Sequence, residues 1–375
     1  MKRIMRNIMI KKTDRYKWIK KIVAIGMMVA LMCSVLTGCR VNTDNPDGPT
    51  EIFYAGKLGG NSGSKLQVVT TIFPEYDWVR EIVGMGTNGA GMSAAEYVDV
   101  SMLMDEGADL HSFQPSAADI AQISTCDVFI YVGGESDLWV EDALKDVQNK
   151  NMVVIKLLDV LGEQAKEEEV VEGMEAEDED EDNHEDEDNH HEGGEKEFDE
   201  HVWLSLENAK VFCTEITDTL AGLDSNHADI YRANLDAYNN KLSQLDKEYR
   251  EAVDSAAVKT VLFGDRFPFR YMFDDYGLKY YAAFVGCSAE TEASFETIIF
   301  LSQKIDELGL HSICTIEKSN QKIANTVKEN TKTKDQEILM MNSLQSITSE
   351  EVMAGASYLD EMKNNLEVLK KALGE

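Results

Sequence analysis

The feature that most constrains the fold is a series of short apolar runs that alternate with helical patterns. In the first half of the chain we expect strands at 68–73, 98–104, 127–132 and 152–155. Except at 98–102, apolar residues in these runs mostly fall at consecutive positions rather than at alternate ones, so both faces of the sheet have to be covered. The pattern therefore predicts an α/β fold in which a parallel sheet lies between helices.

The second half of the chain repeats this pattern. Strands are expected at 260–263, 280–284, 312–316 and 338–341, and a final helix at 349–373. Between the halves, residues 226–256 contain no Gly or Pro and predict one helix about 45 Å long, at 1.5 Å per residue. The apolar spacing is too irregular to favour the alternative, a coiled-coil arm. We expect two lobes, each a small parallel sheet flanked by helices, joined by one long strut helix.

The N-terminal segment has the pattern of a lipoprotein leader. Residues 1–21 are basic, residues 22–37 are apolar, and Cys39 follows a Leu-Thr-Gly sequence. So short an apolar run after a basic flank is typical of a signal peptide rather than of a membrane span. The cysteine resembles the lipid-attachment residue of a bacterial lipobox, and the alternative is an ordinary signal with a chance cysteine. The predicted segments are a signal peptide, a flexible tether, an N-terminal lobe, a linking helix and a C-terminal lobe, at 1–38, 39–65, 66–225, 226–256 and 257–375.

An acidic, histidine-containing loop at 163–200 interrupts the N-terminal lobe. Residues 167–200 contain 20 acidic residues and one lysine, and so contribute −19 to the formal net charge of −33. A surface this acidic argues against nucleic acid as a partner, because phosphate contacts need basic side chains. We expect 167–197 to be a disordered collector of cations, and the alternative is a solvated linker whose histidines are incidental. The histidines concerned are His184, His190 and His191.

Polar residues follow several predicted strands, at the sheet edge where open parallel sheets bind ligands. His111 follows the second strand and His201 follows the acidic loop, while Asp265 and Glu317 follow strands of the second half. Two imidazoles that face oxygen ligands across a cleft suit a borderline divalent metal such as zinc. Each residue also has a structural alternative, as a surface histidine, or as a carboxylate that pairs with a neighbouring cation or caps a helix.

These features resemble the metal-binding solute-binding lipoproteins of bacterial ABC importers, in their zinc/manganese branch, over residues 66–375. In that family a G-x-D-P-H-x-x-x-P segment supplies one ligand, and residues 107–115 match it except that Leu replaces the first Pro. A D-P-H-x-W-L segment supplies a second, and residues 199–204 match it except that Glu replaces Pro. The acidic loop and the long helix between two α/β lobes are further family features. The resemblance implies that His111 and His201 are metal ligands.

The resemblance fails in the second half of the chain. The family's third ligand, a His or a Glu, falls on Gly264, and its fourth, an Asp, is replaced by Asn342. We expect Asp265 to substitute for the third ligand. Glu317 is our candidate for the fourth, since a second carboxylate neutralises a divalent cation held by two imidazoles. Asn342, water and a thiolate from Cys287 are the alternatives.

The four cysteines outside the leader show no C-x-x-C spacing and so do not predict a zinc finger or a redox motif. They are Cys126, Cys213, Cys287 and Cys314. Two of them, Cys126 and Cys314, lie in apolar runs, which favours buried free thiols. A disulfide stays open as the alternative.

The resemblance implies an extracytoplasmic receptor, anchored to the cell membrane by a lipid on Cys39, that binds zinc and delivers it to an ABC permease and its ATPase. We expect a monomer and not an enzyme. Manganese stays an alternative, because oxygen ligands relax the preference for zinc. Two other classes also stay open, an adhesion-type lipoprotein with residual metal binding and a zinc-dependent hydrolase, for which no catalytic motif is present.

Overall fold

The computed structural model describes residues 65–175, 197–288 and 292–374. The predicted leader, the lipid-attachment Cys39 and the loop residues His184, His190 and His191 lie outside this part of the chain. None of the helices in the described part combines the length and the apolar character that a membrane crossing needs.

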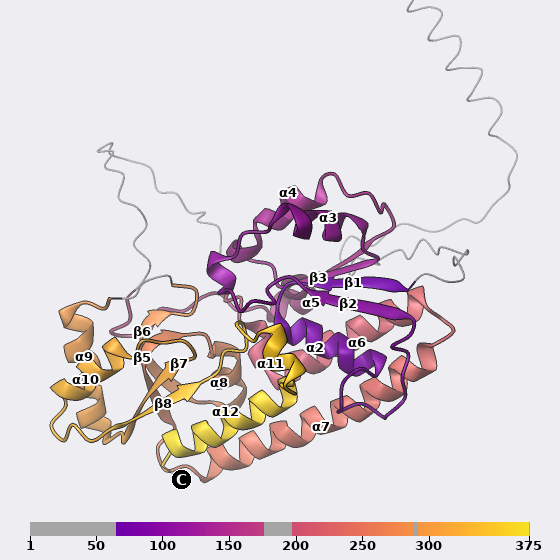
Figure 1. The fold of residues 1–375 in the computed structure, drawn as a ribbon. Coiled ribbons are helices and arrows are strands. Elements are labelled where there is room, and N and C mark those ends of the chain that lie inside the picture. Colours follow the sequence, from indigo (N-terminus) through magenta and orange to yellow (C-terminus); the bar gives the residue numbers. More distant parts are fainter. Residues whose placement is uncertain (1–64, 176–196, 289–291, 375) are drawn as a thin grey trace, which may run out of the picture. The chain divides into compact units, whose positions relative to one another are not determined.

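The first lobe is built on a four-stranded parallel sheet (Figure 1). The strands lie in the order β2-β1-β3-β4, with β1 in register with β2 and β3 on either side of it. Helices connect successive strands, as the alternating pattern predicts. The elements are β1 Leu66–Thr70, α2 Phe73–Val83, β2 Val98–Met102, α3 Ala117–Thr125, β3 Val128–Tyr131, α4 Trp139–Leu144, β4 Val153–Lys156 and α5 Leu157–Leu161.

The second lobe repeats this topology, with strands in the order β6-β5-β7-β8, all parallel. The predicted fold class, two small parallel sheets flanked by helices, is therefore confirmed. The elements are β5 Thr260–Phe267, α8 Arg270–Tyr276, β6 Lys279–Val285, α9 Phe295–Leu308, β7 Ser312–Ile316, α10 Lys322–Asn330, β8 Glu337–Met341, α11 Ser349–Met353 and α12 Tyr358–Ala372.

The predicted strut helix is α7, Ala228–Ser255, which is about 42 Å long at 1.5 Å per residue. It packs against α2 of the first lobe and against α12 of the second, beside which it runs in Figure 1. The hydroxyl of Tyr249 donates to the backbone oxygen of Met362 in α12 at 2.6 Å. One buried apolar cluster extends from β1 through α7 to β5, so the two lobes share a core.

Three expectations about elements need correction. The final helix is not continuous, because Gly355 adopts a φ of 109° and Ser357 caps a new helix, α12. Strand β5 continues to Phe267 with an irregular register, so Asp265 lies within the strand rather than after it. Helix α6, Leu206–Leu223, was not predicted, although it packs along α7.

The acidic stretch is also more ordered at its start than expected. Glu167 pairs with Phe198 in an antiparallel bridge, and Glu175 pairs with Phe284 of β6. The side chain of Lys166 forms an ion pair with Asp274 at 2.6 Å. The prediction of disorder is therefore wrong for residues 167–175, which are attached to the second lobe.

Within the described residues the four cysteines are free thiols, three of them buried. The prediction of buried free thiols at Cys126 and Cys314 is confirmed, and Cys213 shares that state. Cys287 differs, because it is only partly buried and lies beside His111, one of the predicted ligands.

Candidate metal site

The same local arrangement positions His111 and His201. His111 lies in a 3-10 helix, Leu110–Ser112, and its backbone N–H donates to Asp109 Oδ1 at 3.1 Å. His201 immediately precedes another 3-10 helix, and its backbone N–H donates to Asp199 Oδ1 at 2.9 Å. An Asp side chain that accepts from the backbone two residues on forms a local turn. Each Asp-x-His segment therefore presents its imidazole from a braced turn.

The two imidazoles face each other through their Nε2 atoms, which lie 3.4 Å apart. Their Nδ1 atoms point to acceptors: that of His201 is 3.0 Å from Asp199 Oδ1, and that of His111 is 2.8 Å from Ser136 Oγ. The carboxylate of Glu200 lies 3.6 Å from the same His111 nitrogen. Protons on both Nδ1 atoms satisfy these acceptors and leave two Nε2 lone pairs opposed, an arrangement that a cation between them stabilises.

The spacing and the charge of the two rings fit a metal ion. With Zn–N bonds of about 2.0–2.1 Å, two nitrogens on a tetrahedral centre lie about 3.3–3.4 Å apart. Burial, and then the neighbouring His201, lowers the pKa of His111 to about 3, so this ring is in the neutral form that binds metals. A carboxylate behind a ligating imidazole fixes its tautomer and raises its basicity. The structure thus brings together the two histidines predicted from the sequence.

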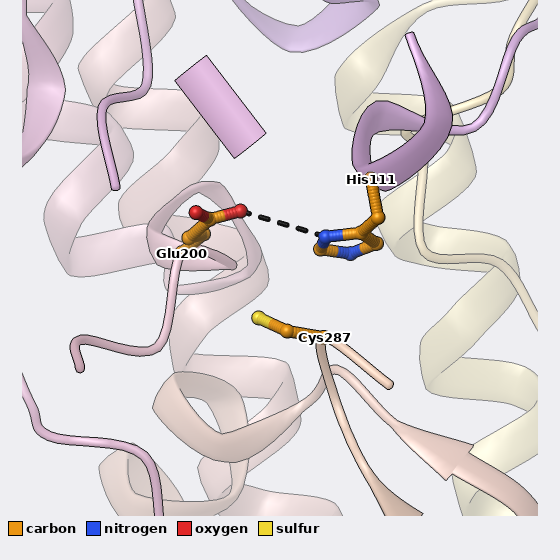
Figure 2. Close-up of side chains that lie close together, drawn as sticks. All are labelled: His111, Glu200 and Cys287. Carbon is orange, nitrogen blue, oxygen red and sulfur yellow. Dashed lines mark ion pairs between the residues drawn. The ribbon is translucent and has the colours of Figure 1, made fainter. Parts of the chain in front are cut away.

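Glu200 and Cys287 lie beside His111 on separate segments, and the Glu200 carboxylate faces the imidazole, whereas the Cys287 sulfur is directed to the side of Glu200 (Figure 2). Among the described residues these three offer ligand atoms that all lie within 4.8 Å of one another. Glu200 is 2% exposed and accepts from the Ser136 backbone N–H at 2.8 Å through Oε1. Its other oxygen, Oε2, is buried without a hydrogen-bond partner, and burial raises the pKa of this carboxyl.

Cys287 follows the end of β6, where its backbone N–H donates to Glu168 Oε1 at 3.2 Å. Burial raises the pKa of its thiol well above the ordinary value, and the carboxylates of Glu200, Asp199 and Glu168 add to that effect. Sequence reasoning weighed Cys287 only as an alternative and did not consider Glu200 as a ligand. The available signal was that Glu200 replaces the proline of the D-P-H motif.

Asp265 and Glu317 lie near His111 but outside this group. All three line a cavity of about 360 Å³. Asp265 accepts from the Arg266 backbone N–H at 3.0 Å and from the Ser319 hydroxyl. Glu317 accepts from the Ser343 backbone N–H at 2.7 Å and from its hydroxyl at 2.5 Å. Their carboxylates brace turns of the second lobe, and their role as ligands stays a prediction.

Two positions of the second lobe differ from the expectation. A Cβ at Gly264 would lie 2.6 Å from Cα of Ala324 in α10, so a side chain there would meet this helix instead of a metal. The placement of the family's third ligand at Gly264 is therefore wrong for this backbone. The side-chain oxygen of Asn342 accepts from the Leu344 backbone N–H at 2.8 Å, which stabilises a turn in which Leu344 has a φ of 64°.

Contacts between the lobes surround the cavity. Arg266, in β5, forms an ion pair with Asp109 of the first lobe, and this pair lowers the pKa of Asp109 against the effect of burial. Lys318 Nζ donates to the backbone oxygen of Gly107 at 2.6 Å. A basic side chain from the second lobe thus holds the turn that carries His111.

Comparison with known proteins places these observations in a family. The family model described as ZnuA, zinc-uptake complex component A periplasmic, matches residues 68–372. The zinc-binding protein AdcA of Streptococcus pyogenes is 31% identical over 312 residues, which cover 82% of this chain and 56% of that protein. The chain thus spans little more than half the length of this relative. The high-affinity zinc uptake system protein ZnuA of Bacillus subtilis is 30% identical, over 84% of this chain and 89% of its own.

A solved structure shares the fold. The Zn(II)-bound ZnuA-like domain of Streptococcus pneumoniae AdcA aligns with a TM-score of 0.61 and 27% identity. The alignment covers 83% of this chain and 100% of that domain. Both lobes and the helix between them therefore correspond to a known two-lobed arrangement.

Proposed function

The chain belongs to the ZnuA family of zinc-uptake components, and from this premise we propose that it is the extracytoplasmic zinc receptor of an ABC importer. It captures the ion between its two lobes and delivers it to a membrane permease that is driven by an ATPase. The curated relatives described above are named for zinc, which favours zinc over manganese. A lipid on Cys39 anchors it to the membrane, and it acts as a monomer.

The opposed histidine pair carries this proposal. Its Nε2 atoms are 3.4 Å apart, and carboxylates lie behind both Nδ1 atoms. Neutral imidazole and a carboxylate partner are the combination found at protein zinc sites. The proposal makes the protein a binding protein and not an enzyme, since its family is described as a component of a zinc-uptake complex.

Capture involves little movement of the lobes. The strut helix α7 packs on helices of both lobes, and a shared apolar core connects them. Residues 165–175 of the acidic segment add contacts from the first lobe to β6 and α8 of the second. We expect entry and release of the ion to depend on local opening around Arg266 and Lys318, whose contacts with Asp109 and Gly107 cross the cavity.

Calorimetry on histidine variants tests the proposal. Replacing His201 with Ala removes a ligand nitrogen, so we expect the zinc affinity to fall by orders of magnitude. His111→Ala should do the same at a position that is less buried. His311→Ala is the matched control, because His311 is exposed and lies outside the cavity lining.

The control should bind zinc as the wild type does. Near-unchanged binding by both His111→Ala and His201→Ala would overturn the assignment. Circular dichroism on each variant separates loss of a ligand from loss of the fold, since His201 is fully buried.

A further inference from the structure

The two histidines of the candidate site are in contact with different lobes. The His111 ring lies 2.8 Å from Ser136 Oγ, and both residues belong to the first lobe. The His201 ring instead packs on the turn that follows β6 in the second lobe, because a Cβ at Gly286 would be only 3.0 Å from His201 Cε1. The distance between the two imidazoles therefore depends on how the second lobe holds His201.

The described ends of the acidic segment connect the second lobe to His201. We call residues 165–175 the strap and residues 197–199 the return strand, which leads directly into the histidine segment. The two pair in antiparallel fashion, and the Asp199 backbone N–H donates to the Lys166 oxygen at 2.9 Å. A movement of the strap is therefore passed to the return strand.

The far end of the strap is attached to the second lobe. The Glu175 backbone N–H donates to the Ala283 oxygen at 3.0 Å, and Glu175 Oε1 accepts from the Ser294 N–H at 2.6 Å. Gly173 has a φ of 81°, and a Cβ there would lie 2.0 Å from the Phe300 ring in α9. A glycine is needed at this position, because it allows both the positive φ and the close approach to α9.

Tyr271, in α8, joins the second lobe to the strap and to the return strand. Its hydroxyl accepts from the Lys166 backbone N–H at 2.8 Å and donates to the Asp199 backbone oxygen at 3.1 Å. The side chain is 1% exposed, and burial raises the pKa of the hydroxyl, which therefore keeps the proton that it donates. The Asp199 carboxylate accepts in turn from the backbone N–H and Nδ1 of His201. A series of hydrogen bonds thus runs from α8 to the imidazole.

We propose that the strap and the return strand form a latch: while they are docked on the second lobe, Tyr271 holds His201 in position to bind zinc, and their undocking lets the ion leave. This inference rests on the proposed function. Tyr271 is a positioning residue that acts through Asp199. The contacts that cross the cavity act on the turn of His111, and the latch acts on the other histidine.

Tyr271→Phe tests the latch in the full-length chain, because it removes only the hydroxyl. The variant leaves the Lys166 N–H and the Asp199 oxygen without this partner, so the undocked form becomes more populated. We expect zinc to dissociate about tenfold faster, since two hydrogen bonds are lost. Rapid mixing of the zinc-loaded protein with a chelator measures this rate. Hydrogen–deuterium exchange, which detects local opening, should be faster in the strap and the return strand.

Tyr249→Phe is the matched control. The Tyr249 hydroxyl is also buried and also joins two elements, through its hydrogen bond to Met362 in α12. Neither tyrosine lines the cavity, and Tyr249 is not a partner of the strap. We expect Tyr249→Phe to release zinc at the wild-type rate, even if its stability is lower.

A second pair of variants tests the strap at a position away from Tyr271. Gly173→Ala places a methyl group against the Phe300 ring and should push the strap off α9, so we expect faster zinc dissociation here too. Gly162→Ala is its control, because Gly162 also has a positive φ, 53°, but a Cβ there meets no atom within 4 Å in the described part of the chain. Both changes strain the backbone, and only Gly173→Ala adds a clash.

The outcomes separate the latch from the proposed function. A wild-type dissociation rate in Tyr271→Phe, or an equal acceleration in Tyr249→Phe, would overturn the latch and leave the zinc receptor intact. Faster release without faster exchange in the strap would contradict undocking. Acceleration in Tyr271→Phe but not in Gly173→Ala, or an equal acceleration in Gly162→Ala, would show that the strap has no part in release. A wild-type chain that binds no zinc would overturn both proposals.

Discussion

At the scale of single residues, we expect the negative charge of Asp199 to strengthen zinc binding, because this side chain lies behind His201. Its Oδ1 accepts from both the backbone N–H and Nδ1 of His201. Asp199→Asn keeps an acceptor of the same shape but removes the negative charge that makes the imidazole more basic. We expect zinc affinity to fall by about tenfold to a hundredfold, measured by competition with a chelator.

The chain contains a matched control for this change. Asp224 makes the same kind of contact with His227 Nδ1, at 2.6 Å, outside the lining of the cavity. Asp224→Asn should leave zinc affinity unchanged. An equal loss in both variants would mean that the effect comes from general destabilisation and not from the ligand's partner.

At the scale of elements, Asn234 joins α7 to the loop that follows α2. Its fully buried side chain accepts from the Ala90 N–H at 2.8 Å and donates to the backbone oxygens of Ile82 and Met92, both at 2.9 Å. Asn234→Ala leaves three backbone groups without this partner, and each costs about 1–3 kcal/mol if water does not replace it. We expect a loss of about 3 kcal/mol in the free energy of unfolding, measured with denaturant.

We expect Asn234→Ala to lower the stability of the protein without changing its zinc affinity. The contacts of Asn234 lie outside the cavity, so zinc affinity at a temperature where the variant is folded should match the wild type. A variant that unfolds at the wild-type midpoint would show that these hydrogen bonds contribute little.

Asp77 lies in α2 and connects this helix to α12. Its raised pKa predicts that the stability of the protein depends on pH. It accepts from the Tyr358 backbone N–H at 2.8 Å, and burial, followed by the charge of Glu81, raises its pKa from 3.8 to about 7, while Arg80 opposes and Asp360 adds to the rise. Between about pH 4 and pH 7 the folded protein therefore holds a proton that the unfolded chain has released. This contribution to stability is complete below about pH 4 and is lost as the pH rises through 7.

Replacing Asp77 with Asn removes this proton linkage while it keeps a side-chain oxygen for Tyr358. Between pH 5 and pH 7 the slope of unfolding free energy against pH should become less negative by up to about 1.4 kcal/mol per pH unit, the value for one proton. Thermal unfolding across that range measures the slope. Parallel curves for wild type and variant would contradict the raised pKa.

At the scale of the whole molecule, the acidic segment and the cavity are predicted to be separable. The Glu168 backbone N–H donates to the Glu197 oxygen at 2.9 Å, so a hydrogen bond joins the chain before residue 176 to the chain after residue 196. Replacing 176–196 with a short Gly-Ser linker should leave one tight zinc equivalent. The intact chain should bind further weak equivalents, which metal analysis and calorimetry on both forms would reveal. Loss of the tight equivalent would place part of the site in the segment.

Local sequence was sufficient to predict the alternating elements and the strut helix, whereas the two histidines were selected by the resemblance of two short motifs to a known family. Strands and helices follow from the spacing of nearby apolar residues. In the structure, an Asp two residues before each histidine fixes the turn that carries it, which is also a short-range relation. The break in the last helix and helix α6 were missed for different reasons. Gly355 gives a signal that was overlooked, whereas α6 lies in a stretch to which the strand-and-helix pattern assigned no element.

The sequence by itself determined which residue types this protein has available for a metal, namely imidazoles, many carboxylates and a few thiols. Only the tertiary structure decided which of these lie together. Asp265 and Glu317 are engaged by neighbours within the second lobe, Gly264 faces α10, and Cys287 reaches His111 and Glu200 from the end of β6. The reason is physical, because a ligand set depends on side-chain directions across two lobes, and a spacing along one chain does not specify them.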